Sequence, residues 1–235
     1  MNTQKLLSLT RQAIDKYNMI DEGDSVAVGI SGGKDSLTLL YLLAKLRDFY
    51  PKHFTLKAIT INLGYEDVDF SEVRKLCQEL SVEYRILDTQ IYEILKQKDT
   101  GKPFCSLCAR LRRGAIKQVM EDMGCNKLAY AHHKDDVIET AVMSLLNEGQ
   151  FYCFPPVTNQ DSFSVIRPLI YVPEYMIKSY SASMNFPIVF NPCPYDHNSQ
   201  RSVVKSMIEY LARKNRTYKS NIFHAVTKIW DTSGG

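Results

Sequence analysis

The sequence predicts an α/β fold: a Rossmann-like, parallel sheet of five strands with helices on both faces, followed by C-terminal helices. Short apolar segments alternate along the chain with longer segments whose apolar residues recur at helical spacing. Such alternation implies right-handed crossovers and a mainly parallel sheet. The first apolar segment also ends at a pair of glycines that leads into the next helix, as a tight strand-to-helix turn requires. The chain has 235 residues, of which 45% are hydrophobic, so it can build the core of one large domain.

The five predicted strands are short apolar runs, each followed by turn residues or by a helical pattern. Because ligands of such sheets bind beyond the carboxyl ends of the strands, the turns after the first, second and fourth strands should meet at one edge. In chain order the predicted strands are 25–30, 54–63, 82–88, 126–133 and 164–170.

The predicted helices show apolar residues at helical spacing and, in several cases, a terminal signal. Ser71 is a candidate N-cap, Gly124 and Gly149 are candidate C-caps, and a proline stands near the first turn of the helix at 173–185. After residue 190 a turn-rich loop leads into two further helical segments. The helices before that loop are an amphipathic one within 1–20 and those at 36–49, 70–80, 109–124, 135–149 and 173–185.

Composition narrows the class of protein. The N-terminus lacks the basic start and apolar stretch of a signal peptide, and no window has the roughly 20 apolar residues of a membrane helix. The expected location is therefore the cytoplasm, without membrane association. A net charge of +3 does not by itself demand a nucleic-acid partner. In a reducing compartment, the six cysteines are expected to bind metal or do chemistry rather than form disulfides.

Residues 31–36 read SGGKDS and form the turn after the first strand. Gly32 and Gly33 permit close approach of a ligand, the next helix offers its free N–H groups, and Lys34 adds a cation. The serines at both ends add hydroxyl donors. Asp35 would repel phosphate unless a magnesium ion lies between them. The turn is thus a candidate phosphate site, although it is not a Walker A motif.

Two cysteines stand three residues apart in PFCSLCARLRRG, and a third lies in NPCPYD. Cys105 and Cys108 can reach one metal centre from a loop-to-helix boundary, and the rigid loop around Cys193 suits metal ligation. Zinc, with His197 as a fourth ligand, an iron–sulfur cluster and a redox dithiol all fit this pattern. The remaining cysteines are expected to be small buried hydrophobes or bystanders: Cys77, Cys125 and Cys153.

The segment AHHKDD ends the fourth strand and begins a helix. Asp135 or Asp136 can cap that helix, and the same carboxylates could face magnesium or a substrate group. The adjoining His132 and His133 favour a functional turn over a purely structural one.

Five motifs occur in one order over about residues 20–225: SGGKDS, CSLCARLRRG, AHHKDDVIET, IRPL and NPC…NSQR. This combination resembles the PP-loop ATP pyrophosphatases and, within them, the tRNA 2-thiocytidine synthetase family. The resemblance implies a PP-loop nucleotide-binding domain over 1–190, including the CxxC segment. It assigns 191–235 to a C-terminal cysteine loop and helical appendage.

The resemblance implies an ATP-dependent tRNA-cytidine 2-sulfurtransferase that releases AMP and pyrophosphate. Such an enzyme adenylates the C2 oxygen of the anticodon-loop cytidine at tRNA position 32 and replaces it with sulfur. The implied cofactors are ATP, Mg²⁺ and a 4Fe-4S cluster. The implied partners are tRNA and a sulfur donor, either sulfide or a cysteine desulfurase, and a homodimer is compatible with the pattern.

The resemblance also implies roles for individual residues. The cluster ligands would be Cys105, Cys108 and Cys193, which are catalytic together with Lys34 and Asp35, and Asp35 would also bind magnesium. The nucleotide would be bound by Ser31, Gly32, Gly33, Lys34, Asp35, Ser36, Ile61, His132 and Asp136.

Basic side chains flank the three cysteines, where an RNA backbone would have to lie. Such runs are usually solvated helix faces, but here they are expected to bind phosphates and to supply affinity rather than sequence reading. The candidate RNA-binding residues are Arg110, Arg112, Arg113, Arg201 and Lys205.

Several alternatives stay open on the sequence. The chain lacks the second CxxC that bacterial members of the family usually carry near NPCPYD, so the RNA target is open. A thiouridine synthetase or a small-molecule sulfur enzyme would share the same motifs. Lysidine synthesis, in which an amino acid attacks the adenylated cytidine, needs no cysteine cluster, so Cys105 and Cys108 argue against that alternative. A non-catalytic zinc or iron–sulfur module would bind nucleotide as a regulatory ligand and release no pyrophosphate.

Overall fold

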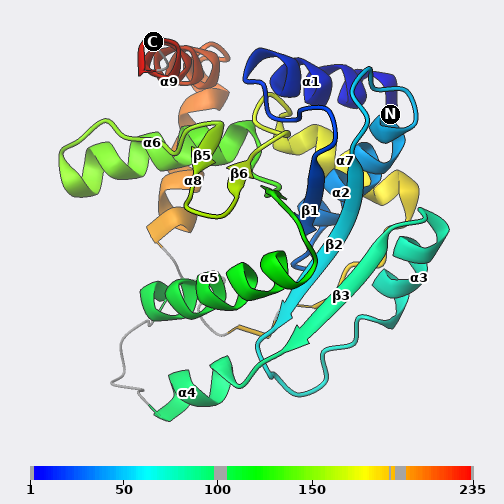
Figure 1. Cartoon of the computed structure of the whole chain (residues 1–235). Helices are drawn as coiled ribbons and strands as arrows, with labels where there is room; N and C mark the ends of the chain where they lie inside the picture. Colours follow the sequence, from blue (N-terminus) through cyan, green and yellow to red (C-terminus); the bar gives the residue numbers. More distant parts are fainter. Residues whose placement is uncertain (1–2, 98–104, 191, 194–199, 234–235) are drawn as a thin grey trace.

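The computed structural model describes residues 3–97, 105–190, 192–193 and 200–233. Its centre is a six-stranded sheet in the order β3-β2-β1-β4-β6-β5, with helices on both faces (Figure 1). The strands are β1 Ser25–Gly29, β2 Thr55–Asn62, β3 Glu83–Asp88, β4 Lys127–Ala129, β5 Val157–Asn159 and β6 Ser164–Ile166.

The five predicted strands are all present and parallel, but the sheet has a sixth that the sequence analysis missed. β5 pairs antiparallel with β6 at the edge of the sheet. It is only three residues long, and its VTN sequence has too few positions for alternation to be visible. A tight connection, in which the Gln160 amide donates to the Phe163 carbonyl, returns the chain to β6.

Two predicted strands are shorter than expected. β4 ends at Ala129 and β6 at Ile166, although 126–133 and 164–170 were predicted. Beyond β4 the Tyr130 amide still donates to the Ile166 carbonyl, and the chain then turns to begin the next helix. The shortening leaves residues 130–133 as a loop at the carboxyl edge of the sheet, and Lys134, Asp135 and Asp136 form the first turn of α6.

The helices largely match the prediction. α5 begins four residues before the predicted 109, so it includes both cysteines of the CxxC motif, and α4 was not predicted. Ser71 is not an N-cap: Phe70 holds that position, and the Ser71 hydroxyl donates to Asp69. The helices are α1 Thr3–Lys16, α2 Lys34–Arg47, α3 Ser71–Glu79, α4 Ile91–Gln97, α5 Cys105–Asp122, α6 Lys134–Glu148, α7 Glu174–Met184, α8 Gln200–Lys214 and α9 Tyr218–Ser233.

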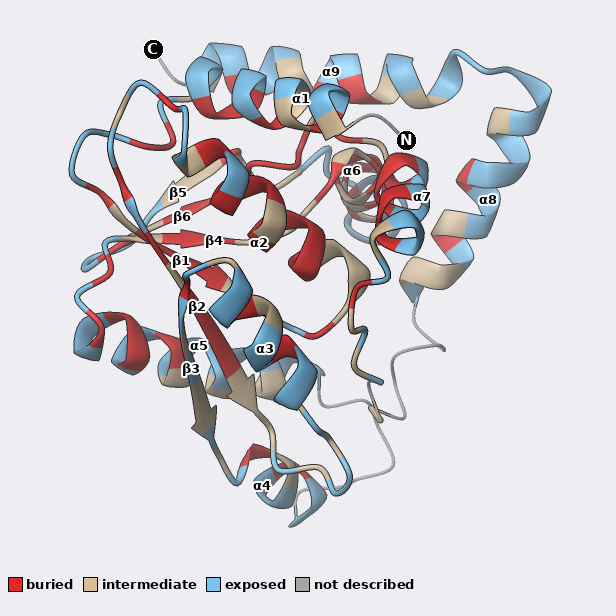
Figure 2. Cartoon of the chain, turned by 90° about the vertical axis from the view of Figure 1, so that its right-hand side faces the viewer, coloured by how far each residue is buried: buried red, intermediate tan, exposed pale blue. Residues whose placement is uncertain are grey.

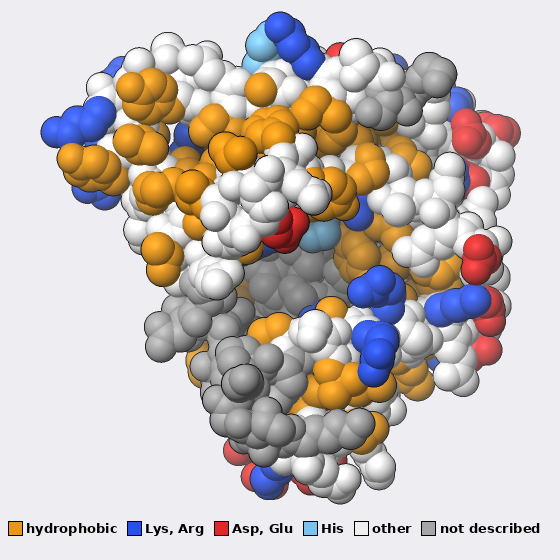
Figure 3. Space-filling view, turned by 90° about the vertical axis from the view of Figure 1, so that its left-hand side faces the viewer, with side chains coloured by type: hydrophobic (Ala, Val, Ile, Leu, Met, Phe, Trp, Pro, Cys, Tyr) orange, Lys and Arg blue, Asp and Glu red, His pale blue; other side chains and the backbone are white. Residues whose placement is uncertain are grey.

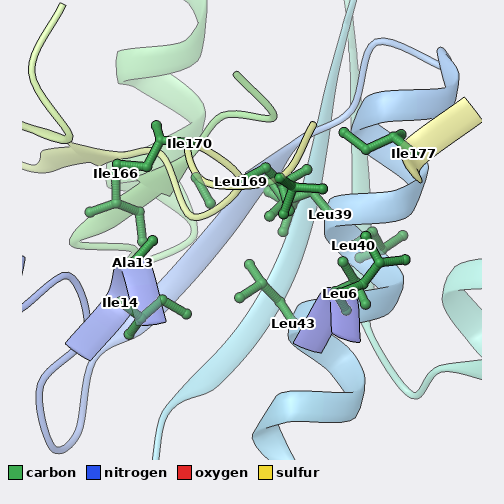
Figure 4. Packing of buried hydrophobic residues seen from close by; sticks show 14 of the residues in the cluster. Leu6, Ala13, Ile14, Leu39, Leu40, Leu43, Ile166, Leu169, Ile170 and Ile177 are labelled. Carbon is green, nitrogen blue, oxygen red and sulfur yellow. The ribbon is translucent and has the colours of Figure 1, made fainter. Parts of the chain in front are cut away.

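The larger part of the core lies on the face of the sheet that α1, α2 and α7 cover. α2 is the most deeply buried of these helices (Figure 2), and its Leu39, Leu40 and Leu43 are completely inaccessible. Leu6 and Ile177, from α1 and α7, approach the same region (Figure 4). Full burial of each such side chain contributes about 1.5–3 kcal/mol, so this layer fixes the start of α2 relative to the sheet.

α5 packs against the opposite face of the sheet. Its Ile116, Val119 and Met120 are buried against Ile59 of β2 and Val165 of β6. The other residues of its sequence are mainly exposed or half-buried. α5 therefore holds the CxxC motif beside the carboxyl ends of the central strands.

The C-terminal helices α8 and α9 pack against α6 and against each other. Phe223, Val226 and Trp230 of α9 are buried and belong to the main core. Within the described part of the chain, none of the helices has the length and apolar character that spanning a membrane would need.

Candidate active site

The SGGKDS turn connects β1 to α2 at the carboxyl edge of the sheet. Gly32 has a φ of +81°, and a Cβ at this position would lie 2.7 Å from the Cβ of Val189. The Val189 amide donates to the Gly32 carbonyl at 3.0 Å. α2 has Gly33 at its N-cap, with no side chain to cap its first N–H groups. Those groups can therefore receive an anion at the positive end of the helix dipole.

The two charged residues of the turn are already paired with other side chains. Lys34 Nζ lies 2.8 Å from Asp35 Oδ2 and 3.4 Å from a carboxylate oxygen of Glu174. Asp35 Oδ1 is buried without a hydrogen-bond partner, and His133 Nε2 is 3.8 Å from it. A buried carboxylate oxygen with no donor is suited to a hard cation, so Asp35 fits the magnesium role predicted for it.

A cavity of about 690 Å³ opens between the SGGKDS turn, the sheet and α5. On this side of the molecule, Figure 3 shows a hollow with a histidine and an acidic side chain at its upper edge and Lys or Arg side chains beside it. Eight predicted site residues from four segments line the cavity: Ser31, Asp35, Ser36, Ile61, Arg112, Arg113, His132 and Asp136.

The residues of the AHHKDD segment have different structural roles. His133 is the N-cap of α6, and it forms a reciprocal capping box with Asp136. His132 lines the cavity, and burial lowers its pKa to about 4, so its imidazole is neutral at pH 7. Asp135 instead accepts from the Glu174 amide and from Lys219, so its role is to join α6 to α7 and α9.

The three cysteines of interest lie close enough to interact. Cys105 and Cys108 occupy the first turn of α5, and Cys193 is half-buried. Burial raises the pKa of Cys108, Arg112 opposes this shift, and the thiols of Cys193 and Cys105 raise the pKa further. Tyr65, in the loop after β2, hydrogen-bonds to Cys193, so that loop also belongs to the site.

This arrangement fits a cofactor held by thiolates. The three thiols come from two segments and influence one another, and the positive charge of Arg112 offsets part of the rise in the pKa of Cys108 that burial causes. Among the described residues, no three His, Cys, Asp or Glu side chains are arranged to hold a metal ion as they stand. His197, the fourth ligand of the zinc alternative, lies outside the described residues.

The basic residues predicted to bind RNA fall into two groups. Arg110, Arg112 and Arg113 are exposed on α5. Within the described part of the chain, these three arginines form no ion pair. Arg201 and Lys205 of α8 are instead held in ion pairs, Arg201 with Asp136 at 2.9 Å and Lys205 with Glu174 at 2.7 Å. The first group is thus available to a polyanion, whereas the second joins α8 to the nucleotide side of the site.

Glu139 of α6 is a buried carboxyl in the middle of this charged cluster. It is 5% exposed and lies 3.9 Å from both Arg201 and Lys205. Burial, the largest influence, raises its pKa from 4.5 to about 7, and the nearby Asp136 and Glu174 act in the same direction. The folded protein therefore takes up a proton at Glu139 that the unfolded chain would release.

We expect Glu139→Gln to stabilise the fold at high pH. Between about pH 4.5 and pH 7 the folded state holds the Glu139 proton and the unfolded state does not, so the stability of the wild type falls as pH rises through this window. At pH 8 the variant should gain up to about 3 kcal/mol in free energy of unfolding, and near pH 4 the gain should vanish. Urea denaturation at several pH values measures this difference. Glu148→Gln, an exposed position on the same helix, is the control, and a pH-independent gain for Glu139→Gln would contradict the prediction.

Some residues that the structure places at the site were not predicted from the sequence. Glu174 contacts Lys34, and Tyr130, Phe154 and Arg167 line the cavity. Arg167 belongs to the IRPL motif, so the sequence did contain a signal that this residue is functional. The tyrosine and the phenylalanine have no such mark, because an aromatic residue that lines a cavity has the same sequence pattern as one in the core.

Comparison with known proteins gives concordant matches. Residues 4–216 match the family model described as PP-loop domain. The chain is 39% identical over 230 residues to a tRNA-cytidine(32) 2-sulfurtransferase of Methylobacillus flagellatus, covering 95% of this chain and 75% of that protein. It is 40% identical to the protein of the same name from Legionella pneumophila (strain Paris), covering 96% and 81%. Among solved structures, it resembles the U34-tRNA thiolase NcsA from Methanococcus maripaludis with its [4Fe-4S] cluster: the TM-score is 0.77, with 25% identity, over 97% of this chain and 80% of that chain.

Proposed function

The chain belongs to the PP-loop family and, within it, to the tRNA-cytidine(32) 2-sulfurtransferase family, and on that premise we propose that it replaces the C2 oxygen of a tRNA cytidine with sulfur. ATP first transfers AMP to the C2 oxygen and releases pyrophosphate. A sulfur nucleophile then attacks C2, and AMP leaves with that oxygen. The observation that carries this proposal is a cavity lined by both the SGGKDS turn and α5; the CxxC cysteines lie on the first turn of α5, next to the part that lines it.

The nucleotide half of the reaction uses the SGGKDS turn. The N–H groups at the start of α2 and the Lys34 ammonium bind the phosphates, and their positive charge stabilises the pyrophosphate as it departs. Asp35, with its partnerless buried oxygen, would hold a magnesium ion, which would offset the negative charge of the phosphates. Lys34 has to exchange part of its pairing with Asp35 and Glu174 for phosphate, so its position before ATP binds is a resting one.

The sulfur half uses the cysteines. When bound by Cys105, Cys108 and Cys193, a 4Fe-4S cluster would offer one iron without a protein ligand and so supply the sulfur nucleophile. Arg112 lies between the two halves: it lines the cavity and acts on Cys108. We assign it to balancing negative charge on the thiolates and on the substrate. Sulfide or a cysteine desulfurase would replenish the sulfur.

The direct test is reconstitution. The anaerobically purified protein, supplied with iron and sulfide, is incubated with ATP, Mg²⁺ and tRNA, and the nucleosides of the digested tRNA are separated by liquid chromatography and weighed by mass spectrometry. We expect 2-thiocytidine together with stoichiometric AMP and pyrophosphate. Thiouridine in its place would transfer the chain to the other thiolase class, and absence of any thiolated nucleoside would refute the proposal.

The exposed arginines of α5 should supply the salt-dependent part of tRNA affinity. Arg113→Ala is expected to weaken tRNA binding and to reduce the slope of log K against log salt by about one, because one phosphate contact is lost. Arg201→Ala should leave that slope nearly unchanged, because the Arg201 guanidinium is engaged with Asp136.

Fluorescence anisotropy with labelled tRNA at several salt concentrations measures both slopes. Thermal unfolding of the two variants separates effects on binding from effects on folding. Arg201→Ala removes the ion-pair partner of Asp136, so this variant should unfold at a lower temperature. Equal slopes for Arg113→Ala and the wild type would show that α5 does not contact the phosphates.

A further inference from the structure

The guanidinium of Arg167 is buried and only partly satisfied. Arg167 follows β6 at the carboxyl edge of the sheet, lines the cavity and is 8% exposed. Its Nη1 donates to the Pro155 carbonyl at 2.7 Å and to the Thr158 hydroxyl at 3.0 Å. Its Nε is buried and has no partner. An unpaired buried donor is costly to a fold, so a ligand that accepts from it would recover a lost interaction.

Arg167 is one of three neighbouring planar side chains that line the cavity. Its guanidinium carbon lies 4.9 Å from the ring centre of Phe154, and that ring lies 4.7 Å from the ring of His132 with an interplanar angle of 34°. The Nδ1 of His132 is likewise buried without a partner. Planar side chains with unused hydrogen-bonding capacity are the groups by which proteins recognise unpaired RNA bases.

The unused edge of Arg167 has a defined chemistry. Because Nη1 is engaged with Pro155 and Thr158, the remaining edge consists of Nε and Nη2, two parallel N–H donors. Such a fork pairs with two neighbouring acceptors. Cytosine presents O2 and N3 side by side as acceptors. Uracil carries a hydrogen on N3, so of the two pyrimidines only cytosine matches the fork.

We propose that Arg167 selects the target base by binding the O2–N3 edge of cytosine through its Nε and Nη2 groups. The inference rests on the proposed function, which places a pyrimidine in this cavity. Nε is covered in this structure, so an entering base displaces a side chain beside it. Tyr152 lines the same cavity and keeps 56% of its surface exposed, so its side chain can shift without disturbing the core.

The test compares two anticodon stem-loop RNAs that differ only in cytidine or uridine at the target position. Their dissociation constants are measured by fluorescence anisotropy with the wild type and with Arg167→Lys, which keeps the charge but loses the fork. We expect the wild type to prefer the cytidine RNA by about tenfold or more, as one bidentate pair allows. Arg167→Lys should bind both RNAs within about threefold of each other, with an unchanged dissociation constant for ATP.

Thr158→Val separates the structural contact of Arg167 from base selection. It removes one partner of Nη1 and spares the fork, so it should lower the unfolding temperature while keeping the cytidine preference. If Arg167→Lys is too unstable to assay, Arg167→Gln is measured in its place, with loss of preference again expected. A preference retained in the folded Arg167 variant, or absent from the wild type, would overturn the inference.

The same proteins are also assayed for thiolation of the cytidine RNA. If the wild type thiolates it and the Arg167 variant keeps its base preference, the inference fails and the proposed function stands. If the preference depends on Arg167 but no thiolated nucleoside forms, the proposed function fails and the inference stands.

Discussion

Replacing Cys108 with alanine is expected to reduce 2-thiocytidine formation to the background rate and to leave ATP binding within about twofold of the wild type. Cys108 is half-buried on the first turn of α5, beside Cys105 and within reach of Cys193. A cluster that loses one of three protein ligands is not retained, so the sulfur nucleophile disappears. The nucleotide is held by a different segment, the SGGKDS turn, which this substitution does not touch.

The measurements are iron and acid-labile sulfide content, an optical spectrum, ATP affinity and the yield of thiolated nucleoside. Cys125→Ala is the matched control, because Cys125 is buried two residues before β4, where its sulfur interacts with the Met123 carbonyl. The control should keep its iron and its activity. Normal thiolation by Cys108→Ala would show that the cysteines are not the cluster ligands.

Replacing Gly32 with alanine is expected to cost about 2–4 kcal/mol of folding stability and to weaken ATP binding by about 10–100-fold. The cost has two sources. At a φ of +81°, an L-residue other than glycine is strained, and the added Cβ would lie 2.7 Å from Val189 Cβ. Relief requires the turn or the Val189 segment to shift, and the donors that should bind phosphate shift with it.

Gly33→Ala provides the comparison for stability. Gly33 has a φ of −79°, and a Cβ there would come no closer than 3.4 Å, to the Ser31 hydroxyl. We expect its free energy of unfolding to change by less than about 1 kcal/mol. Chemical denaturation and calorimetric titration with ATP measure both effects. Equal stability of the two variants would show that Val189 yields without cost.

The parts of this molecule that could be predicted from its sequence are those with a local cause. The strand before SGGKDS is a continuous apolar run, and the helix after it has its own periodicity, so the turn between them was placed correctly. The αL cap at Gly149 was likewise predictable, because few other residues adopt that conformation easily. β5 was missed because its pairing with β6, and not its own three residues, makes it a strand.

The candidate site divides in the same way. The phosphate turn and the cysteine spacing are visible in the sequence. The partners of Arg201 and Lys205 are not, because Asp136 and Glu174 are brought to them by folding from 65 and 31 residues away. A run of basic residues in a sequence has the same appearance whether it faces RNA or completes an internal charge network.

The hydrogen bond from the Val189 amide to the Gly32 carbonyl has a thermodynamic consequence. It joins the phosphate turn to the chain four residues before Cys193, so it offers a short route by which a shift at one site could reach the other. By linkage, we expect that if cluster occupancy changes the affinity for ATP by some factor, ATP changes the retention of the cluster by the same factor. Titrating ATP into the iron-loaded and iron-free protein would measure that coupling. A non-zero value would mean that the protein binds ATP with a different affinity when its cluster is in place.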